Sequence, residues 1–553
     1  MKRLALVVTM AFLASAAFAQ TEEPRTQCGT PTGQERFPLY SYKELPQLEK
    51  PNQADWKKVK GVNLSWGSKD VRYSATSVPV ARKLTSLRLK GWKGQRVFAQ
   101  AVIWTGRDAK DVEYEMSDLV SGKAVIPSER FENGFVRYVM ADAIEGPDGA
   151  TCNNRSDHTT YDSTMVADCI DQYLKKMDMK AMQTQPVWLT CWIPEDAKAG
   201  VYKGTLTVKE AGKAVAKVAL FVEVEDKVLP DPSKWAFHLD LWQNPFAVAR
   251  YYQVPLWSQE HMDAMRPVME RLAQTGQKVI TASITHWPWN HQTEDAFETM
   301  ITWTKGVDGT WSYGFNVFDK WVEFMMSCGI DEQINCYSMA PWKLTFKYLD
   351  EATYSLKEIS TNPGEKEYEE LWTSFLKAFA KHLKEKGWFE KTTIAMDERP
   401  MEVMQQIIGI VRKADPDFKI SLAGNYYPEI DKDIYDYCIL WRQEFPEGVI
   451  DRRRSEGKFS TYYTCCGPAY PNMFLMSSPS ESYDIMVALI GKNSDGYLRW
   501  AYNSWPLEPL LDARYVTWPA GDTFLVYPGN RSSIRFQRIL DGIQEYEKAH
   551  LSK

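Results

Sequence analysis

The stretch "TTIAMDERP", residues 392–400, joins a short apolar, β-prone segment to two neighbouring carboxylates. Asp397 and Glu398 stand where that segment ends, and Arg399 and Pro400 follow them. Proline suits the first turn of a helix, because the N–H that it lacks would have no partner there. The stretch therefore predicts a strand that ends near Asp397 and a helix that begins near Pro400.

The same order of strand, loop and helix repeats through the second half of the chain. Apolar β-prone segments alternate with segments whose apolar residues recur at spacings of three and four. Eight such strands predict a (β/α)8 TIM-like barrel over residues 235–550. An open doubly wound sheet is the alternative, but no glycine-rich phosphate loop follows any of the segments. The predicted strands are residues 235–242, 278–284, 334–340, 392–397, 419–424, 437–441, 459–465 and 496–502.

The first half has a different pattern, with short alternating apolar stretches separated by turn residues. Two of these stretches flank "KEAGK", residues 209–213, which is typical of an antiparallel hairpin. We therefore expect an all-β sandwich over residues 20–228. The segment "LPDPSKW", residues 229–235, contains two prolines in a short polar stretch and predicts a linker to the barrel.

The first residues resemble a targeting segment. A basic start precedes an apolar run over residues 4–17 and small residues at 17 and 19, which predicts a signal peptide over residues 1–19. The run is shorter than the roughly 20 residues of a membrane-spanning helix, and no later stretch reaches that length without charges. Because Cys28 lies eight residues beyond the predicted cleavage point, no lipid anchor is indicated. We expect a periplasmic or secreted protein with no membrane span.

Composition narrows the classes of partner and cofactor. Loss of residues 1–19 changes the formal charge from −6 to −8, and acids and bases are mixed along the chain, so nucleic acid is not an expected partner. The seven histidines show no metal-ligand spacing, and we expect neither a metal nor another cofactor. The nine cysteines define no framework; Cys152 with Cys169, or Cys465 with Cys466, are two possible disulfides. The oligomeric state stays open.

The barrel prediction gives the two carboxylates a position suited to chemistry. Active sites of such barrels lie at the carboxyl ends of the strands, where Asp397 and Glu398 are expected. Neighbouring side chains in a strand point to opposite faces, so both reach one pocket only where the strand bends or ends. The alternative is a structural ion pair with Arg399. If the two acids are catalytic, we expect Arg399 to point away from them.

A glycosidase usually places two carboxylates on either side of the bond that it cleaves. The seventh predicted strand, residues 459–465, offers no acid at its end, and the next acid in the chain is Glu481. A substrate can supply the nucleophile itself through a 2-acetamido oxygen, and a well-oriented intramolecular group has an effective molarity of ~10⁵ to 10⁸ M. The enzyme then needs one acid for the leaving oxygen and one carboxylate for the acetamide N–H.

Four stretches resemble glycoside hydrolase family 123, the β-N-acetylgalactosaminidases: "AMDERP" (395–400), "SDGYLRWAYNSWP" (494–506), "GDTFLVYPG" (521–529) and "SSIRFQRILDGIQEYE" (532–547). The resemblance implies a retaining, substrate-assisted exo-hydrolase that releases terminal β-linked N-acetylgalactosamine through an oxazolinium ion. It also implies that Glu398 is the general acid/base and that Asp397 orients the acetamide. Members of the family hold the acetamide carbonyl with a tyrosine, for which Tyr426 is our choice over Tyr427.

Other pocket residues are expected from their places near strand ends. Asn425 suits a bond to a sugar hydroxyl, although asparagine is common in turns without any ligand. Asp240 and Trp242, which end the first predicted barrel strand, suit the rim of the pocket, and His238 is expected inside the barrel. Aromatic rings can stack on a sugar but also pack cores. The candidates for the aromatic floor are Trp500 first, then Trp441 and Trp505.

Two other functions stay open at this point. One is a sugar-binding protein on an inactive barrel, which the intact pair Asp397 and Glu398 disfavours. The other is a β-N-acetylglucosaminidase, whose substrate differs only at the C4 hydroxyl. In each case the expected partner is a glycan, from a glycolipid or a glycoprotein.

Overall fold

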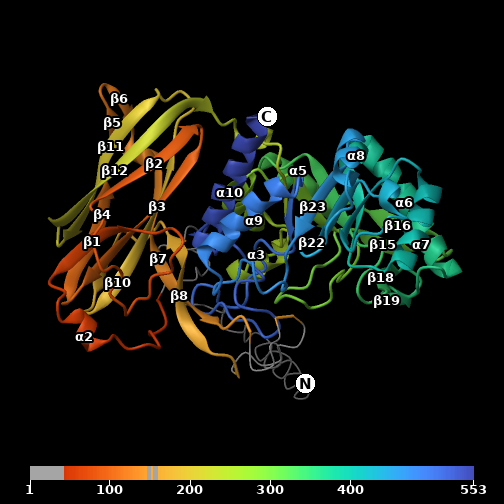
Figure 1. The fold of residues 1–553 in the computed structure, drawn as a ribbon. Helices are drawn as coiled ribbons and strands as arrows, with labels where there is room; N and C mark the ends of the chain where they lie inside the picture. Colours follow the sequence, from red (N-terminus) through yellow and green to blue (C-terminus); the bar gives the residue numbers. More distant parts are fainter. Residues whose placement is uncertain (1–42, 146–150, 153–159, 553) are drawn as a thin grey trace, which may run out of the picture.

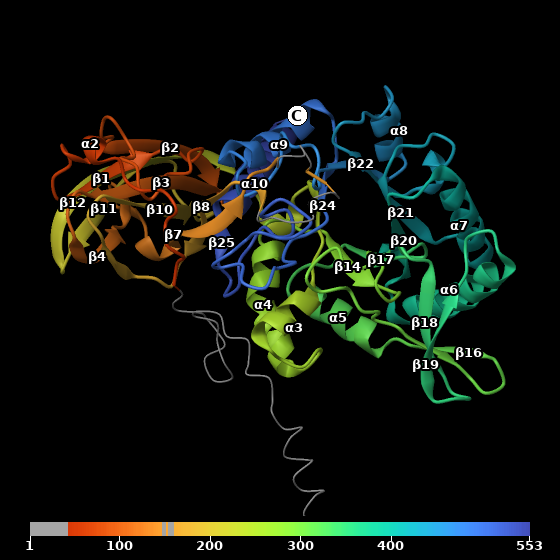
Figure 2. The ribbon, with the colours of Figure 1, turned by 90° about the horizontal axis from the view of Figure 1, so that it is seen from below.

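The computed structural model describes residues 43–145, 151–152 and 160–552. The predicted signal peptide, residues 1–19, lies outside the described residues. Figures 1 and 2 show two regions side by side, an all-β region and a region of alternating strands and helices, with helices α9 and α10 between them. This arrangement confirms the predicted fold class.

The first region consists of two sheets. The six-stranded sheet has the order β1-β3-β10-β7-β8-β25, and the second sheet follows the path β2-β12-β11-β4-β9, with β5 and β6 at its side. The strands of the first sheet are β1 (Val62–Gly67), β3 (Arg96–Thr105), β7 (Phe131–Asp142), β8 (Ser163–Asp171), β10 (Gln183–Trp192) and β25 (Ser532–Ser533). Those of the second are β2 (Ser86–Lys93), β4 (Ala109–Met116), β5 (Leu119–Ser121), β6 (Ala124–Ile126), β9 (Lys176–Met179), β11 (Gly200–Glu210) and β12 (Lys213–Val228). A short helix, α2 (Gln53–Trp56), precedes them.

The predicted hairpin is present as β11 and β12, which pair antiparallel. Buried and less buried residues alternate along β12, as expected for a strand with one face against a core. Its inward residues, Val218 and Leu220 among them, join Leu64 and Ala101 of the other sheet in one hydrophobic cluster. The two sheets therefore enclose a common core and form a sandwich.

The second region contains eight parallel strands in the order β13-β24-β23-β22-β21-β20-β17-β14. The eight predicted strands are confirmed, with ends that differ by a few residues. Between β13 and β14 the ladder is a single bridge, Leu239 to Gln277, which leaves the barrel nearly closed. There the side chain of Gln243 donates to the carbonyl of Val279 at 3.1 Å. The bounds are β13 (His238–Leu241), β14 (Val279–Ser283), β17 (Gln333–Tyr337), β20 (Thr392–Asp397), β21 (Lys419–Gly424), β22 (Asp436–Leu440), β23 (Phe459–Tyr463) and β24 (Gly496–Arg499).

Helices cover the barrel, and α6 illustrates why they form. Its apolar residues recur at helical spacing and are buried, Phe375 and Phe379 among them. It ends at Gly387, whose φ of 72° is left-handed and whose N–H caps the carbonyls of Leu383 and Lys384. The helices are α3 (Pro245–Tyr252), α4 (Gln259–Ala273), α5 (Asn316–Ser327), α6 (Lys366–Lys386), α7 (Met401–Ala414), α8 (Val449–Ser455), α9 (Pro479–Gly491) and α10 (Ile534–Leu551). Short 3-10 turns occur at η1 (Ser128–Arg130), η3 (Pro232–Lys234), η4 (Phe389–Lys391) and η5 (Asp431–Asp433).

A further sheet lies outside the barrel, in segments for which the sequence predicts no strand. Its order is β16-β15-β18-β19, with bounds β15 (Thr302–Lys305), β16 (Trp311–Gly314), β18 (Thr345–Asp350) and β19 (Ser355–Ser360). Trp303 of β15 stacks on Phe375 of α6, with ring centroids 4.5 Å apart, and fixes the sheet against the barrel helices.

The two regions share structural elements. β25 comes from the end of the chain yet pairs with β8 of the sandwich, Ser532 opposite Ile170. Directly beside this pairing, the buried guanidinium of Arg535 lies 3.1 Å from Asp168 of β8. Helix α10 therefore follows directly from a sandwich strand and lies between the two regions (Figure 1). Among the described residues, no helix is long and apolar enough to cross a membrane.

Candidate active site

A cavity of about 510 Å³ opens at the carboxyl ends of the barrel strands. Several strand ends reach it directly, through Ala423 of β21, Leu440 of β22, Tyr463 of β23 and Leu498 of β24. The barrel topology dictates this position, because parallel strands bring all their carboxyl ends to one face. We call it the catalytic cavity.

Asp397, the last residue of β20, is buried in the wall of the catalytic cavity. The indole Nε1 of Trp342 donates a hydrogen bond to Asp397 Oδ2 at 2.7 Å, which fixes the carboxylate. Arg399 lies 3.5 Å from Asp397 Oδ1 and stacks over the Trp342 ring, so the expectation that it points away is wrong. Burial raises the pKa of Asp397, and the nearby Arg399 guanidinium opposes that rise.

Glu398 lies one residue beyond the end of β20 and is exposed to the same cavity. Its backbone N–H donates to the carbonyl of Ala423 at 2.7 Å, which holds the residue against β21. The chain passes close to Gly424 here, where a Cβ would lie 3.2 Å from the Cα of Glu398. Because the strand ends at Asp397, the alternation of side chains is released and both carboxylates line one cavity.

Tyr463 connects the opposite strand end to Glu398. Its hydroxyl donates to Glu398 Oε1 at 2.7 Å. Burial, and then the neighbouring Glu398 carboxylate, raise the pKa of the Tyr463 phenol well above its usual range. The phenol is therefore a permanent hydrogen-bond donor to Glu398. Tyr463 is the last residue of β23, which corresponds to the seventh predicted strand, but from sequence only acids were sought at that strand end.

Aromatic side chains form much of the cavity wall. Trp441 and Trp500 line it, as the sequence analysis predicts. Trp500 meets Trp518 edge to face at 5.8 Å between ring centroids. Trp242, which is expected at the rim, also lines the cavity. So do three tryptophans for which the sequence suggests no role: Trp289, Trp342 and Trp518.

Several predicted binding residues lie outside the cavity wall. Tyr426 packs against Phe445 at 5.3 Å between ring centroids and does not line the cavity. Asn425 accepts a hydrogen bond from Gln443 at 2.7 Å, and of the two only Gln443 lines the cavity. Trp505 is buried in the core, where its Nε1 donates to the carbonyl of Val526 at 2.7 Å.

Asp240 lies inside the barrel, not at the rim where the sequence analysis expects it. It is buried, and the side chain of Asn335 approaches its Oδ2 at 3.4 Å. Burial, and then the nearby carboxylate of Asp436, raise the pKa of Asp240 to about 7. His238 is buried next to it, as predicted, with its Nε2 3.0 Å from Asp436 Oδ2.

A disulfide joins the sandwich region to the catalytic cavity. Cys152 bonds to Cys466, 314 residues further along the chain, and both residues line the cavity. Both pairings considered from sequence are therefore wrong. Cys465 is a free thiol 3.9 Å from Cys466. Sequence spacing cannot reveal a bond between residues that only the tertiary fold brings together.

The described part of the chain contains no group of three or more His, Cys, Asp or Glu residues arranged to hold a metal ion. What the catalytic cavity presents is two carboxylates in different surroundings, one buried and held by an indole, the other exposed and held by a phenol. Carboxylates in unlike environments at one site can divide the roles of acid and anion between them.

Comparison with known proteins agrees with this geometry. The family model of the glycoside hydrolase 123 catalytic domain matches residues 242–552, and that of the glycoside hydrolase 123 N-terminal domain matches residues 66–210. A family 123 glycoside hydrolase from Clostridium perfringens, solved in a study of glycolipid glycan hydrolysis, is 27% identical, with 89% of this chain and 88% of that chain covered and a TM-score of 0.82.

A family 39 glycoside hydrolase from Bacteroides cellulosilyticus is 11% identical, with 79% of this chain and 81% of that chain covered and a TM-score of 0.34. None of the curated proteins matches the sequence. The catalytic-domain model alone spans more than half of the residues. The chain therefore belongs to glycoside hydrolase family 123.

Proposed function

We propose that this glycoside hydrolase is a retaining exo-enzyme that releases terminal β-linked N-acetylgalactosamine and uses the substrate's own 2-acetamido group as nucleophile. One observation carries the proposal: among the described residues that line the catalytic cavity, Asp397 and Glu398 are the only carboxylates. They are sequence neighbours at one strand end, whereas two-carboxylate glycosidases place the acids on opposite sides of the bond. A nucleophile from the substrate removes the need for a third acid.

In this mechanism Glu398 protonates the leaving oxygen and later takes a proton from water. The Tyr463 hydroxyl donates to Glu398 Oε1, which leaves Oε2 as the oxygen that carries the transferred proton. Because Oε1 is held by this hydrogen bond, the position of Oε2 and its proton is fixed as well. Tyr463 is in this reading a positioning residue for the acid.

Asp397 accepts the acetamide N–H and stabilises the positive charge that develops on it as the carbonyl oxygen attacks. This role requires an ionised carboxylate in a fixed orientation. Trp342 supplies the orientation with its 2.7 Å hydrogen bond. Arg399 at 3.5 Å favours ionisation against the effect of burial. The tryptophans around the cavity, Trp500 and Trp441 among them, offer apolar faces for the sugar ring.

The natural glycan and the location of the enzyme are part of the same proposal. The Clostridium perfringens relative was studied on glycolipid glycans, and a terminal sugar on such a glycan is our candidate substrate. A disulfide that spans 314 residues supports an oxidising compartment, periplasmic or extracellular.

The test compares aryl β-glycosides of N-acetylgalactosamine and N-acetylglucosamine, together with two inhibitors. We expect hydrolysis of the first glycoside and strong preference over the second, because a buried polar group left unpaired by the wrong epimer is costly. A thiazoline analogue of the cyclic intermediate should inhibit competitively. A 2-deoxy-2-fluoro glycoside should leave no sugar on the protein.

Mass spectrometry of the protein after incubation with the fluoro sugar gives the decisive result. A covalent glycosyl adduct would refute the substrate-assisted mechanism and identify the enzyme nucleophile by its position. Equal rates on the two aryl glycosides would refute the assigned specificity while leaving the mechanism intact.

A further inference from the structure

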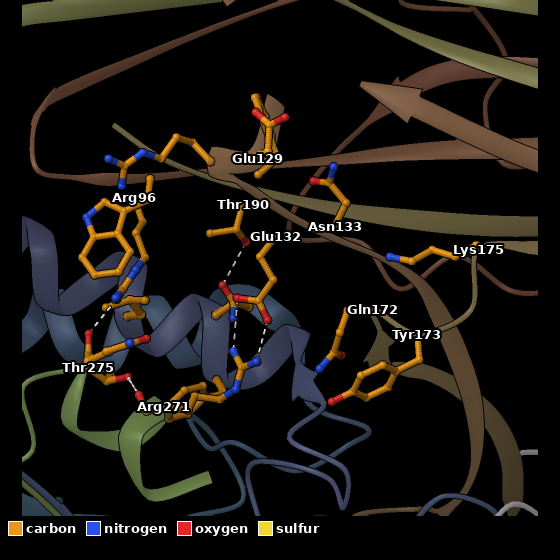
Figure 3. Close-up of a pocket in the computed structure, with 17 residues that line it drawn as sticks. Arg96, Glu129, Glu132, Asn133, Gln172, Tyr173, Lys175, Thr190, Arg271 and Thr275 are labelled. Atoms are coloured by element: carbon orange, nitrogen blue, oxygen red, sulfur yellow. Dashed lines mark hydrogen bonds and ion pairs between the residues drawn. The ribbon is translucent and has the colours of Figure 1, made fainter. Parts of the chain in front are cut away.

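A second cavity, of about 690 Å³, lies between the sandwich and the barrel helices (Figure 3). Its roof is the six-stranded sheet, and its floor is formed by α10 and the end of α4. Gln274 and Thr275 line it just before β14 begins, so it lies toward the amino ends of the barrel strands. The catalytic cavity is at the carboxyl ends. We call this second space the interdomain cavity.

The interdomain cavity has an excess of positive charge in a chain whose formal charge is −6. Four cations line it against the carboxylates of Glu129 and Glu132. Glu132 is already paired with Arg271 at 2.5 Å, and Figure 3 shows this pair between the two ends of the cavity. The other three cations are Arg96, Arg130 and Lys175.

Among the described residues these three cations have no carboxylate partner within 4 Å. Arg96 is buried, stacks over Trp192 at 3.9 Å and donates to the carbonyl of Gln274 at 2.7 Å. Burial lowers the pKa of Arg96 to about 10, so its guanidinium stays charged at neutral pH. Arg130 and Lys175 are exposed at the cavity. Glu129 and Glu132 offset only part of the charge of the four cations, and a net excess of positive charge concentrates anionic ligands.

The same cavity contains unsatisfied acceptors. Asn133 Oδ1 and Gln172 Oε1 are buried oxygens with no hydrogen-bond donor in the described structure. Figure 3 shows Asn133, Gln172 and Lys175 together at one end of the cavity. Buried polar atoms are almost always paired, so each such oxygen needs a donor from water or from a ligand.

The geometry points to a non-catalytic binding site for an anionic saccharide, that is, a sugar that carries a carboxylate or a sulfate group. The three cations without carboxylate partners match the acidic group, and the two amide oxygens match sugar hydroxyls. A simple inorganic anion would interact only with the cations. A neutral sugar would form hydrogen bonds only with the amide groups. The volume is within the range of ~300 to 1,000 Å³ that small-molecule sites occupy.

This site would hold an acidic glycan at the end of the barrel away from the catalytic cavity. It goes beyond the proposed hydrolase activity and does not depend on which terminal sugar is released. Loss of the site should leave turnover of small aryl glycosides unchanged.

Titration calorimetry with the full-length protein tests the proposal by measuring the affinity of four ligands. These are galactose 6-sulfate, glucuronic acid, galactose and inorganic sulfate. We expect the two acidic sugars to bind more tightly than galactose or sulfate, and their affinity to fall as salt is added. The double variant Arg130→Gln/Lys175→Gln should weaken the acidic sugars about tenfold, the scale of two partly exposed charge contacts. Comparison of the two acidic sugars separates carboxylate from sulfate recognition.

The matched control is Arg82→Gln/Lys123→Gln, which removes two exposed cations of the sandwich region that do not line the cavity. It should bind like the unchanged protein. Asn133→Ala should weaken the sugars but not inorganic sulfate. Equal affinity for sulfate and galactose 6-sulfate, equal affinity for galactose and galactose 6-sulfate, equal loss in the control, or no binding of either acidic sugar would each overturn the proposal.

Discussion

The two cavities of this molecule lie toward opposite ends of one barrel and are built from different kinds of side chain. Tryptophans dominate the catalytic cavity, which has few charges besides Asp397 and Glu398. Arginine, lysine and amide groups dominate the interdomain cavity. The first suits the apolar faces of a sugar ring, as proposed above for the hydrolase reaction, and the second suits the charged group of the proposed acidic saccharide. The carboxyl ends of the strands hold the two carboxylates proposed for catalysis, while the boundary between the domains holds the excess of positive charge.

The largest expected effect is a loss of turnover from a change in the catalytic cavity that leaves the interdomain cavity unaffected. Glu398→Gln should lower kcat by ~10² to 10⁴, because an amide cannot donate the proton that the leaving group needs. Binding of acidic sugars in the interdomain cavity should not change. The loss should be smaller for aryl glycosides with very good leaving groups, and steady-state kinetics over a series of leaving groups measures it.

The matched control for this variant is Glu447→Gln, which changes an exposed carboxylate after β22 that does not line the catalytic cavity. It should retain full activity. An equal loss for good and poor leaving groups in Glu398→Gln would remove Glu398 from the acid role.

A second prediction concerns Asp240, in the barrel interior between the cavities. With its pKa raised to about 7, the folded protein keeps a proton on Asp240 that the unfolded chain loses near pH 4. The stability contributed by this group is therefore complete below about pH 4 and is lost as the pH rises to about 7. Asp240→Asn should raise the melting temperature more at pH 8 than at pH 5.

For a pKa shift of this size, the free energy of unfolding changes by at most about 4 kcal/mol between low and high pH. Asp484→Asn on the exposed face of α9 serves as the control and should give the same small change at both pH values. A gain from Asp240→Asn that does not vary with pH would show that the carboxyl does not titrate in this range.

The smallest expected effect is a shift in the pH dependence of kcat/KM, caused by a change beside the catalytic cavity. Arg399 opposes the rise in the pKa of Asp397, so Arg399→Gln should raise that pKa further. Because the proposed mechanism needs ionised Asp397, the acid limb of kcat/KM should move to higher pH. Arg399→Lys keeps the charge and should restore much of the original profile. An acid limb unmoved in Arg399→Gln would mean that another group controls it.

The sequence predicts the parts of the fold that rest on local periodicity. All eight barrel strands and the β11–β12 hairpin follow from alternation and spacing, which are properties of short segments. The sheet formed by β15, β16, β18 and β19 is not among the predicted strands. Its strands are short, and their stability depends on contacts such as Trp303 against Phe375, which the sequence pattern does not reveal.

In the catalytic cavity, too, some residues can be predicted from local sequence and others depend on the tertiary fold. Asp397 and Glu398 are predictable because they end a strand whose place in the barrel is known. Trp342 and Trp518 come from loops, and nothing in their local sequence tells which way a loop turns. Tyr463 could have been found by asking for any polar group at the end of the seventh strand. The partner of Cys152 depends on how the two domains meet and is beyond sequence spacing.

The pairing of β25 with β8 has a consequence for the order of events during synthesis. Until residues 531–535 emerge, β8 is an open edge of a sheet, the kind of strand that pairs with other chains and starts aggregation. That edge contains Asp168 and Asp171, which are buried in the finished structure beside Arg535 and Arg531. Asp168 is paired with Arg72 of the sandwich region as well, so Asp171 depends more on its late partner. A strand from another chain would have to bury the carboxylate of Asp171 without Arg531, at a high cost in desolvation. The edge of β8 therefore disfavours pairing with other chains until the end of this chain has been made.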